Sequence, residues 1–215
     1  MKILFIGNSA TYCNDMPLIL EALINANQKS AKVDSVTRGG GRLCENLSDG
    51  DKKNAELKEL LSVNEYDVLF LQEHGIHGIR NVQGFIDSAG ELISLVGAKR
   101  VILYVPCARK EGNEVLTRCG WTNADMVRLA NGSYERVAEI YNAEVSSAAT
   151  CFKKILDVIP DAPLYAEDIA HPSYIGSCVI ALVHYRTLFG EAPSDLSALN
   201  VGSELLEKML PIIYG

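Results

Sequence analysis

The sequence predicts an α/β protein in which a parallel sheet of about five strands carries helices on both faces. Short apolar runs alternate with helical patterns along the whole length of the chain. Three of the five strand candidates are nearly continuous apolar runs, as expected of strands that are covered on both faces. The predicted strands are 2–6, 32–36, 66–71, 100–105 and 143–148.

The segments between these strands have the spacing of apolar residues that is typical of helices. The first is expected to be capped by Asn14, and the last to end at Gly190 because glycine commonly follows a helix. The least regular stretch, 107–123, is predicted to be a long loop after the fourth strand. The predicted helices are 16–28, 54–62, 82–97, 124–142 and 176–190.

Length and composition limit the class of protein. The chain has 215 residues, of which 48% are hydrophobic and 22% charged, so we expect a single domain, 1–215. The net charge of −7 and the lack of a Lys/Arg cluster argue against a nucleic-acid partner. The apolar runs are strand-sized, which excludes a membrane helix, and the first residues are too short a run for a signal peptide. We therefore expect no membrane partner and a cytoplasmic location.

Six cysteines are scattered through the chain without a C-x-x-C pair. No histidine is placed to complete a zinc set with them, so no metal site is predicted. They are expected to be reduced and mostly buried thiols.

The four loops at the carboxyl ends of the predicted strands are the candidate functional regions, because ligands of parallel sheets bind at this edge. Each loop also has an ordinary structural interpretation. Ser9 suits a helix N-cap, three consecutive glycines suit a turn, polar residues after a strand suit solvent exposure, and an Asp before His-Pro suits a helix start. The four stretches are "GNSAT", "RGGGRL", "LQEHG" and "EDIAHPS".

Together the four loops offer the parts of a nucleophilic site. Asp168 precedes His171 by three residues, so its carboxylate is able to accept the Nδ1 proton and direct Nε2 outward if the loop curls. A serine such as Ser9 becomes a good nucleophile when such a base takes its proton. Gly40 or Gly41 is able to present backbone N–H groups to a developing oxyanion.

These residues resemble the conserved blocks of the SGNH (GDSL-like) hydrolases. The first block, normally Gly-Asp-Ser, is similar to "IGNSAT" with Asn8 in the Asp place, and Gly40 matches the glycine of the second block. The last block, Asp-x-x-His, is similar to "DIAHPSYIG". The carboxyl-terminal phrase "LYAEDIAHPSYIGSCVIALVHYRTLFG" resembles a branch of the superfamily known as a domain of unknown function.

The third block departs from the family pattern. It usually supplies an asparagine as an oxyanion donor, whereas this chain has "FLQEHG" at the end of the third strand. Gln72 is predicted to present an equivalent amide N–H. Asn8, Gly41, Glu73 and His74 are predicted to contact substrate.

The resemblance implies a three-layer α/β/α sandwich, flavodoxin-like, that hydrolyses esters, with acetylated carbohydrate among the substrates. Ser9 is implied as nucleophile, His171 as general base and Asp168 as its orienting acid, while Ser9, Gly40 and Gln72 hold the oxyanion. No cofactor is implied, and the sequence does not indicate the oligomeric state. Two alternatives stay open: a flavodoxin-like domain that binds a phosphate or nucleotide, and a non-catalytic carbohydrate-binding domain.

Overall fold

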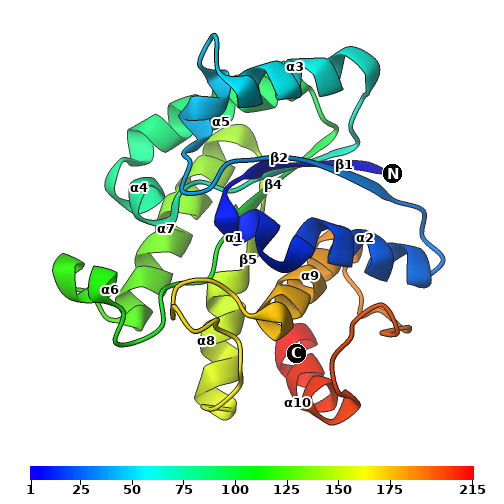
Figure 1. Cartoon of the computed structure of the whole chain (residues 1–215), viewed down its shortest axis with the longest axis vertical. Coiled ribbons are helices and arrows are strands. Elements are labelled where there is room, and N and C mark those ends of the chain that lie inside the picture. Colours follow the sequence, from blue (N-terminus) through cyan, green and yellow to red (C-terminus); the bar gives the residue numbers. More distant parts are fainter.

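The structure, a computed structural model that describes all 215 residues, is a three-layer α/β/α sandwich (Figure 1). Its centre is a five-stranded sheet with the order β2-β1-β3-β4-β5, in which every neighbouring pair is parallel. This arrangement confirms the predicted fold class, and all five predicted strands are present. They are β1 (Lys2–Gly7), β2 (Lys32–Thr37), β3 (Val68–Leu71), β4 (Arg100–Val105) and β5 (Glu144–Ser147).

Helices cover the two faces of the sheet because the side chains of each strand alternate between them. In β1, Ile3 and Phe5 pack into one apolar cluster, and Leu4 and Ile6 pack into the other. The first cluster is closed by α2 (Met16–Ala26), α8 (Ala148–Val158), α9 (Tyr174–Phe189) and α10 (Ser203–Tyr214). The second is closed by α3 (Lys52–Val63), α5 (Val82–Val96) and α7 (Asn123–Tyr141).

The five predicted helices are found with small shifts at their ends, and several further helices were not predicted. Among the latter, α6 (Glu114–Cys119) lies inside the segment predicted to be a long loop. The others are α1 (Ser9–Tyr12), α4 (Gly75–Arg80), α8, α10 and two 3-10 turns, η1 (Cys13–Asp15) and η2 (Leu43–Leu47). No helix combines the length and the apolar character that crossing a bilayer requires.

The prediction that Asn14 caps the first long helix is wrong. Asp15 precedes α2 and makes no side-chain cap hydrogen bond, and both Asn14 and Asp15 have a left-handed backbone with φ 55°. The Asn14 amide instead donates to the carbonyl oxygen of Pro172 at 3.1 Å and to Ser177 Oγ at 2.9 Å. Asn14 therefore ties the start of α2 to the start of α9.

None of the six cysteines is joined in a disulfide in this structure, and only half of them are buried. Cys107, Cys151 and Cys178 lie in the interior, where burial raises the pKa of each thiol and disfavours the thiolate. The prediction of mostly buried thiols therefore holds for three of the six.

The direction of the chain across the sheet reverses between β1 and β3. The chain passes from β1 to β2 on one side and then returns to place β3 on the other side of β1. Loops that follow β1 and β3 therefore diverge and leave a crevice at the carboxyl ends of these strands, which is where ligands bind in open α/β sheets. Ser9 follows β1, and Gln72 follows β3.

Candidate active site

Ser9, His171 and Asp168 form a continuous chain of hydrogen bonds. Ser9 Oγ lies 2.9 Å from His171 Nε2, although the two residues are 162 positions apart in sequence. His171 Nδ1 lies 2.5 Å from Asp168 Oδ2. The structure therefore brings together the three residues whose spacing and chemistry were singled out in the sequence.

The loop that carries Asp168 and His171 curls as the sequence interpretation required. Asp168 Oδ1 accepts the backbone N–H groups of Ala170 and His171, each at 2.9 Å. Burial alone would raise the pKa of this carboxyl, but the hydrogen bonds from the His171 ring and from the two N–H groups lower it to about 2. Asp168 is therefore a carboxylate at neutral pH, and it accepts Nδ1–H and leaves Nε2 as the acceptor for the Ser9 hydroxyl.

The turn that presents Ser9 is held by buried polar side chains. Asn8 Oδ1 accepts the N–H of Ala10 at 3.0 Å, as an N-cap does at the start of α1. Gln72 Oε1 accepts the N–H of Asn8 and the hydroxyl of Thr11, both at 2.9 Å. Gly7 is required at the end of β1, since a Cβ there would lie 2.4 Å from Thr11 Oγ1.

The glycine-rich loop after β2, which matches the second block, is hydrogen-bonded to the same turn. Asn8 Nδ2 donates to the carbonyl oxygen of Gly41 at 3.0 Å. Gly40, the preceding residue, has φ +64°, which side chains disfavour, and it lines the cavity beside Ser9. The predicted neighbourhood of Ser9 and Gly40 is therefore present in the structure.

The side-chain amide of Gln72 makes hydrogen bonds to the backbone as well as facing the cavity. Besides accepting from Asn8 and Thr11, it donates from Nε2 to the carbonyl oxygen of Glu73 at 2.6 Å. One N–H of the amide is thereby occupied, and the second is the one that remains for a ligand. The oxyanion role of Gln72 stays a prediction, and positioning of the Ser9 turn is a role that sequence reasoning missed.

Two of the four predicted substrate contacts do not line the cavity. Glu73 is completely buried, and its carboxylate accepts the N–H groups of His74 at 2.5 Å and Leu43 at 3.3 Å. Gly41 is also buried and faces Asn8 with its carbonyl oxygen. Both residues fasten the loops together, and for Glu73 burial raises the pKa to about 7. Asn8 and His74 do line the cavity.

A cavity of about 200 Å³ opens beside Ser9 and His171. This volume is below the range of about 300–1,000 Å³ that is usual for drug-sized ligands, so the cavity suits a small group. Two of its lining residues, Cys107 and Arg109, belong to the segment 107–123, which the sequence placed on the functional edge without assigning a role to either residue. The other lining residues are Asn8, Ala10, Gly40, Gln72, His74, Gly75, Pro106, Met126 and Ala170.

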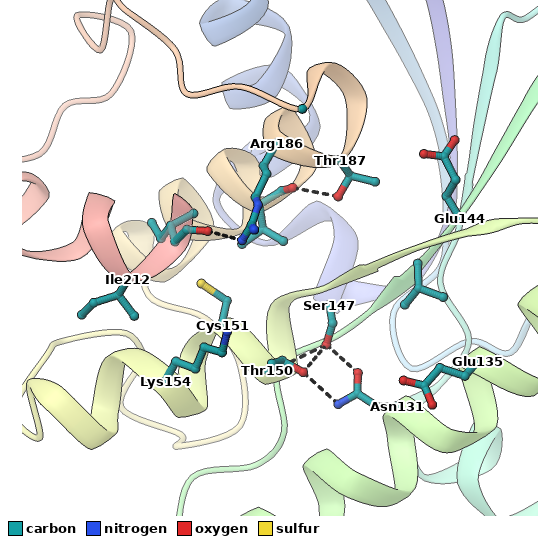
Figure 2. A pocket seen from close by; sticks show the side chains of 14 residues that line it. Asn131, Glu135, Glu144, Ser147, Thr150, Cys151, Lys154, Arg186, Thr187 and Ile212 are labelled. Atoms are coloured by element: carbon teal, nitrogen blue, oxygen red, sulfur yellow. Dashed lines mark hydrogen bonds between the residues drawn. The ribbon is translucent and has the colours of Figure 1, made fainter. Parts of the chain in front are cut away.

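A larger cleft of about 710 Å³ lies away from this site, between β5, α7, α8, α9 and α10 (Figure 2). Its hydroxyl and amide side chains are largely paired: Asn131, Ser147 and Thr150 form one hydrogen-bonded set, and Arg186 donates to the carbonyl oxygen of Ile213. Its cysteine, Cys151, has a pKa raised to about 12 by burial. This cleft therefore offers no activated nucleophile, and the smaller cavity is the better candidate despite its size.

No group of three or more His, Cys, Asp or Glu side chains is arranged to hold a metal ion. The comparison with protein-family models gives no match, and neither does the comparison with curated proteins.

Solved structures do match. A proposed SGNH hydrolase from Slackia heliotrinireducens is 28% identical, with a TM-score of 0.76, covering 87% of this chain and 98% of that one. A protein of the DUF4886 family from Bacteroides uniformis is 12% identical, with a TM-score of 0.82, covering 100% of this chain and 93% of its own. A variant of an acetylxylan esterase from Geobacillus stearothermophilus is 17% identical, with a TM-score of 0.64 and coverages of 88% and 94%.

At 12% and 17% identity, the matches to the Bacteroides and Geobacillus proteins show the fold alone. The Slackia protein adds sequence similarity over most of both chains. The Slackia match thus confirms the resemblance of this chain to the SGNH hydrolase superfamily, and the match to the DUF4886 protein shows that a protein of that family shares the fold.

Proposed function

We propose that this protein is a serine hydrolase that cleaves the ester of a short acyl group. The observation that carries the proposal is the Ser9–His171–Asp168 hydrogen-bond chain at the sheet's switch point. The similarity to a proposed SGNH hydrolase and to the fold of an acetylxylan esterase supports the same class of reaction. Esters of acetylated carbohydrate are the first substrates to test.

In the proposed reaction, Ser9 Oγ attacks the ester carbonyl carbon while His171 Nε2 takes the hydroxyl proton. The Asp168 carboxylate keeps the proton of Nδ1 in place and stabilises the imidazolium that forms. His171 then gives its proton to the leaving alcohol, and water releases the acyl group from Ser9 by the same steps. The N–H groups of Ser9 and Gly40, with the free amide N–H of Gln72, would hold the oxyanion.

The alternative of a phosphate-binding domain gives no role to Asp168 and His171. It also depends on the N-terminus of the helix that follows Ser9, and that helix, α1, is four residues long and already capped by Asn8. The esterase proposal uses all three polar side chains, so we favour it.

The test is hydrolysis of 4-nitrophenyl acetate by the purified protein. Ser9→Ala is expected to lower kcat by about 10³-fold or more, because the remaining groups do not replace a nucleophile. Cys13→Ala is the matched control, since burial and the nearby Asp168 charge raise the pKa of this thiol and disfavour its thiolate. Undiminished turnover by Ser9→Ala, or loss of turnover in Cys13→Ala alone, would contradict the proposal.

A further inference from the structure

The cavity beside Ser9 contains one charged side chain that the esterase mechanism leaves unused. Arg109 lines the cavity together with Ser9 and His171, and it is the only Arg or Lys that does so. Its guanidinium makes no ion pair or hydrogen bond, although the chain holds 27 acidic residues against 20 basic ones. A cation in this place has five N–H donors available to a ligand.

The backbone around Arg109 is anchored on two sides. Toward the catalytic loop, Lys110 N–H donates to the carbonyl oxygen of Ile169 at 3.0 Å, and Tyr165 Oη donates to that of Ala108 at 2.7 Å. Toward α7, Asn123 Nδ2 donates to the Arg109 carbonyl oxygen at 2.7 Å. The base of the arginine is therefore held in register with the loop that carries His171, as a ligand-binding residue requires.

The charge of Arg109 acts across the cavity. After burial, it is the largest cause that lowers the pKa of His74, which lines the cavity as well. It also opposes the effect of burial on the Cys107 thiol. His74 is therefore held neutral at neutral pH, and the cavity presents a single fixed positive charge, that of Arg109.

We propose that Arg109 binds a carboxylate carried by the ester substrate, an inference that rests on the proposed esterase function. A guanidinium matches a carboxylate with two parallel N–H···O bonds, and such charged bonds are stronger than neutral ones. One fixed cation balances one negative charge, which favours a carboxylate over a phosphate dianion. The substrate class is then a short ester of a hydroxy acid, or a half-ester of a dicarboxylic acid.

In these two classes of ester the carboxylate lies on opposite sides of the scissile bond, and matched pairs of probe esters distinguish them. The pair 4-acetoxybenzoate and methyl 4-acetoxybenzoate tests a carboxylate on the alcohol part. The pair 4-nitrophenyl hydrogen succinate and 4-nitrophenyl methyl succinate tests one on the acyl part, after correction for spontaneous hydrolysis. In each pair the readout is the ratio of kcat/KM for the charged ester to kcat/KM for the neutral ester.

For at least one pair, we expect the wild type to prefer the charged ester and Arg109→Gln to lower the ratio by about 10- to 100-fold. Arg109→Lys keeps the charge but loses the planar fork, so its ratio should lie between the two. Lys110→Gln removes the same charge from an exposed neighbour that does not line the cavity, and its ratio should equal that of wild type. Equal ratios in wild type and Arg109→Gln for both pairs would overturn the inference.

Binding to Ser9→Ala keeps this test separate from the test of catalysis. Calorimetry should show tighter binding of the charged member of the preferred pair than of its neutral ester, and the difference should disappear when Arg109→Gln is added. Equal binding of the charged and neutral esters would refute the anion site even in an active esterase. Charge-selective binding to a protein that hydrolyses no ester would support the site and count against the proposed reaction.

Discussion

The carbonyl oxygen of Gly41 determines why position 8, in the turn after β1, is occupied by an asparagine. The first block of the SGNH hydrolases normally has an aspartate in this place. Here the Asn8 side chain uses its oxygen to accept from Ala10 and its nitrogen to donate to the Gly41 carbonyl oxygen. A carboxylate is able to make the first contact but not the second, because it has no hydrogen to donate.

Asn8→Asp is therefore expected to lower the free energy of unfolding by about 1–3 kcal/mol at pH 7, since it places a carboxylate oxygen against a buried carbonyl. Urea unfolding measures this difference. Because a protonated Asp is able to donate to Gly41, the difference should shrink as the pH is lowered. A variant as stable as wild type at every pH would mean that the turn rearranges around the new residue.

Asp168 provides a second prediction about a single side chain. Asp168→Asn keeps the size of the group but presents an amide to His171 Nδ1, and this favours the tautomer in which Nε2 carries the proton and is unable to accept from Ser9. The expected result is a fall in kcat, by up to about 10⁴ if this site behaves like a protease triad. Steady-state kinetics with 4-nitrophenyl acetate measure it, and wild-type kcat would remove Asp168 from the mechanism.

Among the helices, α9 depends on a close approach between its first turn and the segment that leads to His171. A Cβ on Gly176 would lie 2.1 Å from the carbonyl oxygen of Leu164 and 3.1 Å from the ring of Phe152. The same carbonyl oxygen accepts the N–H of Ser173, which caps the helix. The absence of a side chain at Gly176 therefore allows α9 to start beside the catalytic loop.

Gly176→Ala is expected to destabilise the protein by about 1–3 kcal/mol, because the methyl group has no space without a backbone shift. Gly132→Ala in α7 is the matched control: apart from the adjoining backbone of its own helix, no atom lies within 4 Å of the new Cβ, and alanine favours a helix. That change should stabilise by about 0.5–1 kcal/mol. Thermal unfolding of both variants measures the contrast, and shifts of the same sign would contradict the packing argument.

The five strands could be predicted because short apolar runs alternate with helical segments, and the long helices 16–28, 82–97 and 124–142 because their apolar spacing is sustained over many residues. The helices that were not predicted either lacked such a signal or overlapped a segment that the pattern assigned to another element. α4 and α6 are six residues each, too short to show a period, and α10 contains Pro211 and no side-chain N-cap. α8 begins at Ala148, a residue assigned to the preceding strand.

For the whole molecule, the order of the blocks was sufficient to predict that Ser9, Asp168 and His171 meet at one edge of the sheet. The residues that hold or surround them were not predicted, because their roles depend on contacts between distant segments. Gln72 joins Asn8 across 64 positions, and Arg109 reaches the cavity through a loop whose internal helix was not foreseen. The signal available for Arg109 was its place after the fourth strand, on the functional edge.

Two buried titratable groups give the folded molecule opposing responses to pH. Burial lowers the pKa of His184 to about 3, so the folded state resists its protonation and loses stability as the pH falls below the ordinary value of 6.5. Burial raises the pKa of Glu73 from 4.5 to about 7, so the folded state favours its neutral form. The stabilising contribution of that neutral form is complete below pH 4.5 and is lost as the pH rises through 7.

Glu73→Gln removes the second response, and His184 cancels in the difference because it is present in both proteins. The change also removes the partner of His77, whose Nδ1 lies 3.6 Å from Glu73 Oε1. Between pH 4.5 and 7 the folded wild type binds more protons at Glu73 than the unfolded chain does, so wild-type stability relative to Glu73→Gln should fall as the pH rises. The slope should approach about 1.4 kcal/mol per pH unit in the middle of this window. Urea unfolding at pH 5, 6, 7 and 8 measures the difference, with Glu59→Gln, an exposed carboxylate on α3, as the control. A difference between wild type and Glu73→Gln that is constant over this range would mean that Glu73 is already ionised in the folded protein, with the N–H groups of His74 and Leu43 outweighing the effect of burial.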